Sequence, residues 1–393
     1  MIEFIQHTLK CIIKHIDGCN NYELIIDSGK CTEKNNEFSF QTIAPSSFVI
    51  EKIRNDLFPF PRNNINILFD NLNILSEYAC MNKYKFSLLL THQIEHVNII
   101  KSDNNGYCER SWNNIKLGLI AKNGKTLYKD FIIGNDIEET INKININFNL
   151  LLEDASYLEQ EIRLPNGSSS VIFAKGTGGF LVHEILGHMV EGDLISRGMS
   201  IFGNRINIGD KIGADNLNVL DDPYGFNDYI GLNAFDDEGN ILEKVNIVTN
   251  GVLSGYICNE KTAKQLNFKN TGCARRKSYK FKSMPRMRVT YILSNNVGGD
   301  CDSIISSVES GIYVDNICMG QVNPKNGDYL LYCGTGNIIN KGKITDRITN
   351  FIIKDNIINT LNNIELIGND FLLFLLYVLK KSKVCQFVQV HLQ

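Results

Sequence analysis

The chain has 393 residues, enough for about two domains of typical size. Hydrophobic residues make up 43% of it, which suffices for buried cores, and its net charge of -3 lacks the basic excess typical of proteins that bind nucleic acid. Eleven cysteines occur without CxxC or CxC spacing, and the first residues lack the pattern of a secretory signal. We therefore expect reduced thiols, a cytoplasmic location and no nucleic-acid partner.

Residues 1–162 are predicted to form an N-terminal α+β domain. Met1–Ile16 carries an apolar stripe at helical spacing, which predicts an amphipathic helix. Asn123-Gly124 is typical of a hairpin turn, and Pro165–Gly167 indicates the domain boundary. The other elements expected in this region are strands at Tyr22–Asp27, Phe86–Lys101 and Ile115–Lys122, and helices at Ser47–Leu57, Leu72–Met81 and Ile137–Glu161.

Residues 166–393 are predicted to form a strand-rich antiparallel domain, which gives the whole chain an α+β fold class. The longest apolar run, Phe371–Leu379, is shorter than the roughly 20 residues a helix needs to cross a bilayer, so we expect a buried strand or helix end and no membrane partner. Strands are expected at Ser169–Ala174, Glu243–Val248, Val252–Cys258, Val289–Leu293, Tyr329–Cys333 and Ile344–Ile348, and helices around His183 and at Ser303–Glu309.

The residues that indicate chemistry lie in Gly176–Asp193. His183 is followed directly by Glu184, and His188 comes four residues later. Neutral imidazoles bind Zn²⁺, and a carboxylate outside the ligand set can take a proton from a metal-bound water. On a regular helix the two histidines would diverge by about 140°. They reach one metal only if the helix bulges or ends between them, and Gly187 permits such a distortion.

Other polar residues compete with this interpretation. Two histidines and a glutamate on a helix also suit a satisfied polar patch near a core. His92–His96 matches an HxxEH pattern, but its neighbours alternate like a strand, on which the two histidines would lie about 13 Å apart, too far for one metal. Arg275, Arg276 and Arg286 suit a peptide carboxylate, yet we expect them to be structural.

Gly176–Asp193 resembles the metal-binding helix of the TldD branch of the TldD/PmbA family of metallopeptidases. Further segments resemble that family in the same order: Val219–Pro223, Phe235–Gly239, Asn250–Tyr256, Thr271–Arg276, Ser278–Tyr279, Met284–Met287, Gly320–Asn323, Gly327–Asp328 and Ile367–Asp370. An ordered series over roughly the C-terminal 60% of the chain is more specific than one short motif.

The resemblance implies a zinc-dependent hydrolase of extended or unfolded peptides, with the chain as the HExxxH-bearing, TldD-like subunit. It also implies pairing with a PmbA-type subunit, also called TldE; a homo-oligomer is the alternative. The family's third zinc ligand is a cysteine soon after a Gly-Asn-Asp motif. Here Lys381 falls at that position when the segments are aligned, and Cys385 is the only nearby thiol. Cys385 is therefore the candidate third ligand.

Two interpretations remain open. In the first, the chain is a zinc metallopeptidase whose metal ligands are His183, His188 and Cys385 and whose general base is Glu184. In the second, the chain is a non-catalytic scaffold of the same family with an eroded metal site, since the chain also ends earlier than the family usually does. Glu191 and Asp193 are candidates either to orient His188 or to form a solvated helix end.

Overall fold

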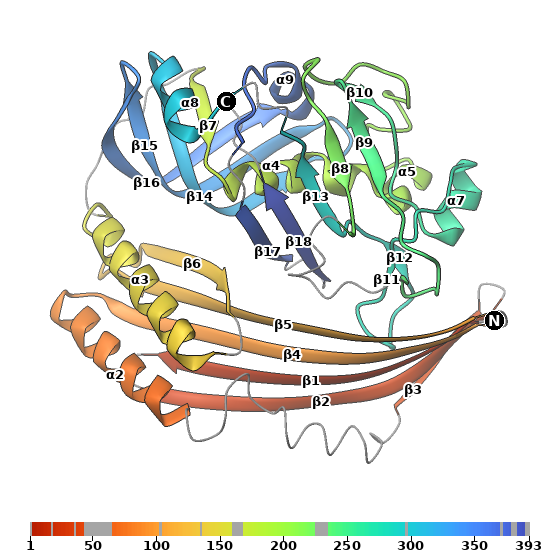
Figure 1. Cartoon of the computed structure of the whole chain (residues 1–393), viewed down its shortest axis with the longest axis horizontal. Helices are drawn as coiled ribbons and strands as arrows, with labels where there is room; N and C mark the ends of the chain where they lie inside the picture. Colours follow the sequence, from red (N-terminus) through yellow and green to blue (C-terminus); the bar gives the residue numbers. More distant parts are fainter. Residues whose placement is uncertain are drawn as a thin grey trace. The chain divides into compact units, whose positions relative to one another are not determined.

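The computed structural model describes residues 2–16, 19–34, 37–42, 65–101, 104–133, 136–158, 168–224, 235–294, 298–369, 372–378 and 383–389, and of the last two segments the backbone alone. The chain forms two compact units (Figure 1). Unit 1 contains Met1–Gln160 and Lys277–Lys282, and unit 2 contains Glu161–Arg276 and Ser283–Gln393. The helix expected at Ser47–Leu57 and the boundary expected at Pro165–Gly167 lie outside the described residues.

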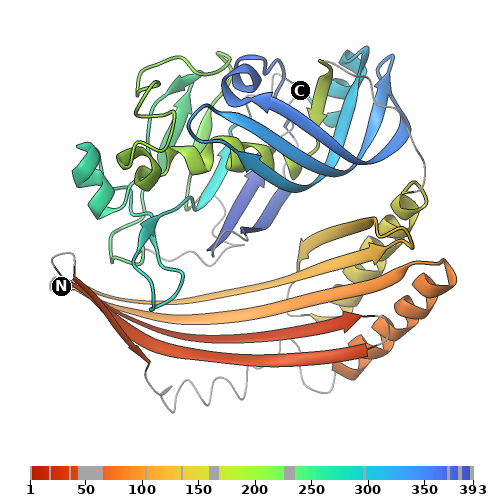
Figure 2. The same cartoon turned by 180° about the vertical axis from the view of Figure 1, so that it is seen from behind.

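Unit 1 is an antiparallel sheet with two helices. The strand order is β3-β2-β1-β4-β5-β6, and Figure 1 and Figure 2 show both helices on one face of the sheet. The strands are β1 (Ile2–Ile16), β2 (Cys19–Lys34), β3 (Glu37–Thr42), β4 (Lys85–Lys101), β5 (Asn104–Ile120) and β6 (Thr126–Ile132), and the helices are α2 (Ile65–Met81) and α3 (Ile137–Ala155).

Local chemistry explains where these elements begin and turn. The side chain of Asp136 accepts a hydrogen bond from the backbone N–H of Glu139, which caps α3. Ile144, Phe148 and Leu151 lie on the buried stripe of that helix. The hairpin expected at Asn123-Gly124 is confirmed, since β5 and β6 pair on either side of it and Gly124 has φ +82°.

The prediction of an N-terminal helix at Met1–Ile16 is wrong, because this segment is strand β1, paired with β2 and β4 along its length. Its first half buries Phe4 in a cluster on one face of the sheet, and its second half buries Cys11 against the helices on the other face. A strand that changes its buried face halfway shows no regular alternation. Its isoleucines also favour strands over helices.

A segment from late in the chain completes the core of unit 1. Tyr279 is 1% exposed and packs with Phe4, Val97 and Ile99. Its backbone N–H donates to Oε1 of Gln6 at 2.9 Å, and its hydroxyl donates to Asp27 at 2.9 Å. The close approach of this ring to the backbone of β2 explains the glycine at position 29, where a Cβ atom would lie 2.0 Å from the ring.

Unit 2 contains two larger sheets and one small one. Their strand orders are β10-β9-β8-β13-β18-β17, β16-β15-β14-β7 and β11-β12. The strands are β7 (Ser170–Phe173), β8 (Val219–Asp221), β9 (Val245–Thr249), β10 (Val252–Leu253), β11 (Ala274–Arg275), β12 (Met284–Pro285), β13 (Val289–Ile292), β14 (Ser310–Val322), β15 (Asp328–Asn340), β16 (Lys343–Asn356), β17 (Leu372–Val378) and β18 (Lys383–Gln389). The helices are α4 (Thr177–Ile185), η2 (Gly187–Val190), α5 (Gly192–Ser196), α7 (Glu260–Leu266), α8 (Cys301–Ser307) and α9 (Ile357–Asn362).

The strand-rich antiparallel character predicted for this region is confirmed, with β7–β14 and β13–β18 as parallel exceptions. Hairpins occur at Asn250-Gly251 and Lys341-Gly342 as expected. Helix α4 lies between the two larger sheets (Figure 2). Phe180, Val182 and Ile185 of α4 belong to the same buried cluster as side chains of both sheets. The core of unit 2 therefore surrounds the helix that carries the HExxxH motif.

Candidate metal centre

Helix α4 ends between the two histidines. Its last residue is Ile185, and Leu186 has φ -120° and ψ -52°, outside the helical region. The chain then forms the tight 3₁₀ turn η2, which carries His188. The helix was expected either to bulge or to end between His183 and His188. It ends there, so this expectation is confirmed.

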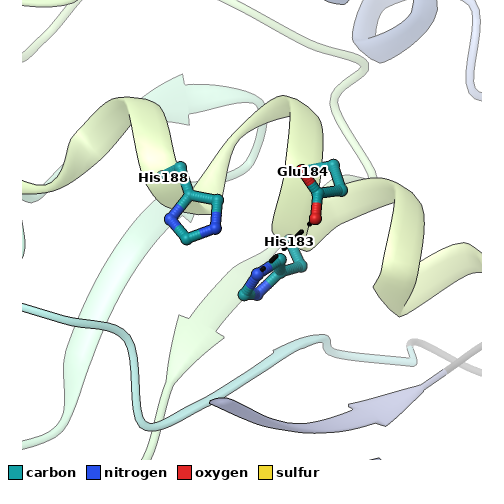
Figure 3. Close-up of side chains that lie close together, drawn as sticks. All are labelled: His183, Glu184 and His188. Atoms are coloured by element: carbon teal, nitrogen blue, oxygen red, sulfur yellow. Dashed lines mark ion pairs between the residues drawn. The ribbon is translucent and has the colours of Figure 1, made fainter. Parts of the chain in front are cut away.

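The broken helix brings the two imidazoles together. Their ring centroids lie 4.3 Å apart at an interplanar angle of 73°. One ligand atom from each of His183, Glu184 and His188 lies within 4.8 Å of the others (Figure 3). Within the part of the chain that the structure describes, no other trio of His, Cys, Asp and Glu side chains meets this condition. The residues singled out by spacing therefore converge in space.

Gly187 is required for space rather than for an unusual backbone angle. It is absent from the residues with positive φ, but a Cβ atom at this position would lie 1.9 Å from the sulfur of Met287. The atoms that it would meet belong to the flexible end of Met287, which is 3% exposed and would have to repack. The turn between the histidines is therefore held closely against the segment that follows β12.

Glu184 lies beside the two rings in a site that is closed on most sides. Its Oε1 is 3.9 Å from Nε2 of His183, and its side chain is 14% exposed whereas that of His183 is fully buried. Gly320 of β14 lets Glu184 fit, because a Cβ there would approach Cγ of Glu184 to 2.8 Å. A carboxylate held next to paired imidazoles, with limited access to water, suits a proton acceptor.

The two histidines have opposite electrostatic environments. Burial, reinforced by the neighbouring His188, lowers the pKa of His183 well below its ordinary value. Burial alone would also lower the pKa of His188, but the charges of Glu191 and Glu184 outweigh it and raise the pKa. The neutral ring of His183 is thus ready to donate a lone pair, while His188 is a basic ligand supported by carboxylates.

Glu191 and Asp193 do not form a solvated helix end, because they are 2% and 6% exposed. Oε1 of Glu191 lies 3.4 Å from Nδ1 of His188 and accepts the backbone N–H of Met287 at 3.4 Å. Asp193 instead lies beside Arg286, at 3.4 Å. Of the two carboxylates, Glu191 contacts the candidate ligand.

Arg286 is the residue near the site that sequence reasoning missed. Its Nη1 lies 2.8 Å from Oε2 of Glu191, and its side chain is 19% exposed. The sequence placed it in a motif, Met284–Met287, but offered no sign that it would meet carboxylates about 90 residues earlier in the chain. Strand β12 pairs with β11, and Arg286, which follows β12, contacts Glu191 across a long sequence separation.

The side chain of Cys385 lies outside the described residues. Its strand β18 pairs in parallel with β13, with Gln386 opposite Val289, and both strands contact α4. The backbone that carries Cys385 is thus a neighbour of the helix that carries His183. Its assignment as the third ligand stays a prediction.

The donor set fits a zinc ion as far as the structure describes it. Two imidazoles are typical ligands of catalytic zinc, which takes three protein ligands and keeps one position open. The carboxylate behind His188 is the usual partner of a zinc-bound histidine. The group is not the set of oxygen donors alone that Ca²⁺ prefers.

Comparison with known proteins agrees with this geometry. Residues 166–386, more than half of the chain, match the family model described as the PmbA/TldA metallopeptidase C-terminal domain. The chain belongs to the PmbA/TldD family. A metalloprotease TldD homolog of Buchnera aphidicola subsp. Acyrthosiphon pisum is 35% identical over 205 residues, which are 52% of this chain and 41% of that relative. A zinc metalloprotease TldD homolog of Saccharolobus solfataricus is 30% identical over 205 residues, 52% of this chain and 45% of that relative.

Two solved structures share the fold of this chain. TldE from Thermococcus kodakarensis matches with a TM-score of 0.73 at 14% identity, over 100% of this chain and 94% of that one. A putative modulator of a DNA gyrase from Thermotoga maritima gives the same score and identity, over 100% and 93%. The chain spans less than half of the length of the TldD homologs matched by sequence. None of the helices that the structure describes is long and apolar enough to cross a membrane.

Two of the other motifs that resembled the PmbA/TldD family, Val219–Pro223 and Phe235–Gly239, contribute buried carboxylates to unit 2. Asp221 is fully buried and pairs with Nε of Arg288 at 2.8 Å. The carboxylate of Asp236 accepts backbone N–H groups of Glu238, Asn240 and Ala274. Burial, together with the charge of Glu238, raises the pKa of Asp236 to about 7. These two carboxylates hold neighbouring strands and loops together, so their contacts assign them a structural role.

Proposed function

We propose that this chain is a zinc-dependent, TldD-like metallopeptidase subunit that hydrolyses peptide bonds. The observation that carries the proposal is the end of α4 at Ile185, which turns HExxxH into a converging pair of imidazoles 4.3 Å apart. His183 and His188 are the ligands supported by geometry, and Cys385 is the proposed third ligand. The relatives named as metalloproteases support the same reaction class.

Each residue has a distinct task in this proposal. Bound zinc would supply Lewis acidity, which activates a water and polarises the scissile carbonyl. Glu184 accepts the proton of the attacking water on its carboxylate and passes it to the leaving amine. The buried ring of His183 and the ring of His188, which Glu191 holds in place, would bind the metal in their neutral forms. The close packing of Gly320 beside Glu184 limits the positions that this carboxylate can adopt.

The substrates and assembly that we propose follow from the family. Extended or unfolded peptides are the substrate class, and a PmbA/TldE-type subunit is the partner, with a homo-oligomer as the alternative. The shared fold of TldE from Thermococcus kodakarensis supports a partner of similar architecture. We also propose a cytoplasmic location, consistent with cysteines that lack metal-binding or disulfide spacing.

A second candidate function is a non-catalytic scaffold with an eroded metal site. The observation that favours it is Lys381, which stands where the family's cysteine is expected and which is a poor zinc ligand because its amine is protonated at neutral pH. Metal content separates the two candidates.

The deciding experiment is elemental analysis of purified protein, for wild type beside His183→Ala. We expect about one zinc per chain in the wild type and a loss of it in the variant. Near-zero zinc in folded, reduced wild type, after zinc is supplied and the excess removed, would favour the scaffold. Cys385→Ser beside Cys318→Ser, an exposed thiol on β14, tests the third ligand: only the first should lower the zinc content.

A further inference from the structure

Arg286 and Met287 make three contacts with the turn that carries His188. The guanidinium of Arg286 pairs with Oε2 of Glu191 at 2.8 Å, and the N–H of Met287 donates to Oε1 of the same carboxylate at 3.4 Å. The side chain of Met287 fills the space above Gly187. All three contacts fall between residues 187 and 191, the stretch that carries His188.

The segment that contains Arg286 and Met287 is itself fixed in unit 2. Strand β12 pairs with β11, and the backbone N–H of Arg286 donates to the carbonyl of Cys273 at 3.0 Å. Glu191 is fixed from the other side, since its backbone forms a parallel bridge with Ile257. Both partners of the Arg286–Glu191 pair therefore sit on anchored backbone, which keeps the entropy lost on pairing small.

The position of Glu191 decides which nitrogen of His188 can bind a metal. Oε1 of Glu191 lies 3.4 Å from Nδ1, so Nδ1–H is the donor to the carboxylate and Nε2 keeps its lone pair. In Figure 3 the two nitrogens of His188 lie on opposite sides of the ring, one of them on the side of His183 and Glu184. A carboxylate that selects the tautomer and fixes the ring angle raises metal affinity.

We propose that Arg286 is a positioning residue of the metal centre: it clamps Glu191 against Nδ1 of His188 and thereby presents Nε2 of that ring to the metal. The inference rests on the proposed metal site. Arginine suits the task because its charge is permanent, and its Nη1 lies close to two carboxylates, Glu191 at 2.8 Å and Asp193 at 3.4 Å. Arg286 touches neither the metal nor the substrate in this proposal and acts only through Glu191.

The test is a double-mutant cycle on zinc affinity, measured by competition with a chromophoric chelator on the full chain. Arg286→Gln and Glu191→Gln are each expected to weaken zinc binding about 10- to 100-fold. The double variant should bind no more weakly than Glu191→Gln alone, because Arg286 acts through that carboxylate. Arg205→Gln, which removes an exposed arginine of the same unit, is the matched control and should bind like wild type.

Two further measurements keep the test decisive. Arg286→Lys preserves the charge but not the shape or reach of the guanidinium, so its affinity should lie between those of wild type and Arg286→Gln even if the glutamine variant folds poorly. Thermal unfolding of each metal-free variant identifies the temperature at which all are folded, and affinities are compared there. A general structural role would give losses that add in the double variant, and this would overturn the inference.

The failure of this inference differs from the failure of the proposed metal site. If wild type and His183→Ala both fail to bind zinc, both proposals are overturned. If wild type binds zinc and His183→Ala does not, while Arg286→Gln and Arg286→Lys bind as tightly as wild type, the metal site stands and the positioning role of Arg286 is wrong.

Discussion

Two segments of this chain carry two histidines and a glutamate within a few residues. The side chains converge in one segment and are spread along a strand in the other. His183, Glu184 and His188 lie at the end of α4, where the rings approach to 4.3 Å. His92, Glu95 and His96 lie on β4, an uninterrupted strand whose residues rise about 3.3 Å each. Composition is nearly the same, so backbone geometry decides which set can share a metal.

The partners of the two sets differ as well. On β4, Nδ1 of His92 bonds with the side-chain oxygen of Asn113, Nδ1 of His96 with the hydroxyl of Tyr107, and Glu95 pairs with Arg110. Each of these side chains has its own partner on the neighbouring strand β5. At the end of α4 the side chains instead face one another. The side chains on β4 are therefore held apart by separate partners, whereas those at the end of α4 converge on one point, which is what a shared metal requires.

The largest expected effect separates the two glutamates. Glu184→Gln should retain zinc and lower peptide hydrolysis by about 10²- to 10⁴-fold, because the amide cannot accept the proton. Glu95→Gln, the matched change on β4, should leave turnover intact. Activity on an unfolded peptide and zinc content are measured for both, with the proposed partner subunit present. Undiminished turnover in Glu184→Gln would refute its role as general base.

Stabilisation by zinc should depend on His188 and not on His96. A ligand that binds only the folded state, present at 100 times its Kd, stabilises that state by about 2.7 kcal/mol. Thermal unfolding with and without zinc should show this gain in wild type and in His96→Ala but not in His188→Ala. Stabilisation by zinc that persists in His188→Ala, or that vanishes in His96→Ala, would contradict the assignment of metal binding to His188 rather than to β4.

The strand that carries His92 and His96 was predictable from sequence, and so was the break in α4. Both predictions rest on local geometry: alternation fixes a strand, and the i to i+5 spacing requires a distorted helix if both rings are to meet. Turn residues such as Asn250-Gly251 likewise act within a few positions of themselves. Local rules therefore recovered several strands of unit 2, among them β7, β9, β13, β15 and β16, and the helix break at the candidate site.

The features that sequence did not reveal depend on distant parts of the chain. Tyr279 enters the core of unit 1 from the second half of the sequence, and β1 changes its buried face to meet both Tyr279 and the helices. Arg286 contacts Glu191, which lies 95 residues earlier in the chain. No local pattern encodes such long-range packing, which is why β1 was mistaken for a helix and Arg286 was given no role.

The break in α4 can be tested directly through Gly187. Gly187→Ala places a methyl group against the buried sulfur of Met287, so we expect a loss of about 1–3 kcal/mol of stability from overpacking. Zinc affinity should also fall, because the turn that carries His188 shifts. Met287→Ala in the same chain should recover part of the zinc affinity, although the cavity that it leaves costs stability of its own. Urea unfolding and zinc competition measure stability and affinity; full affinity in Gly187→Ala alone would show that the turn tolerates a side chain.

The smallest expected effect lies on β4. Tyr107→Phe removes the hydroxyl that bonds to Nδ1 of His96 at 2.9 Å. Tyr107 is 54% exposed, so water can replace the lost partner. We therefore expect a loss of only about 0.5–1.5 kcal/mol in urea unfolding, the net value of one hydrogen bond, and unchanged zinc affinity. A fall in zinc affinity would mean that the polar side chains of β4 affect the metal centre, which would contradict their structural role.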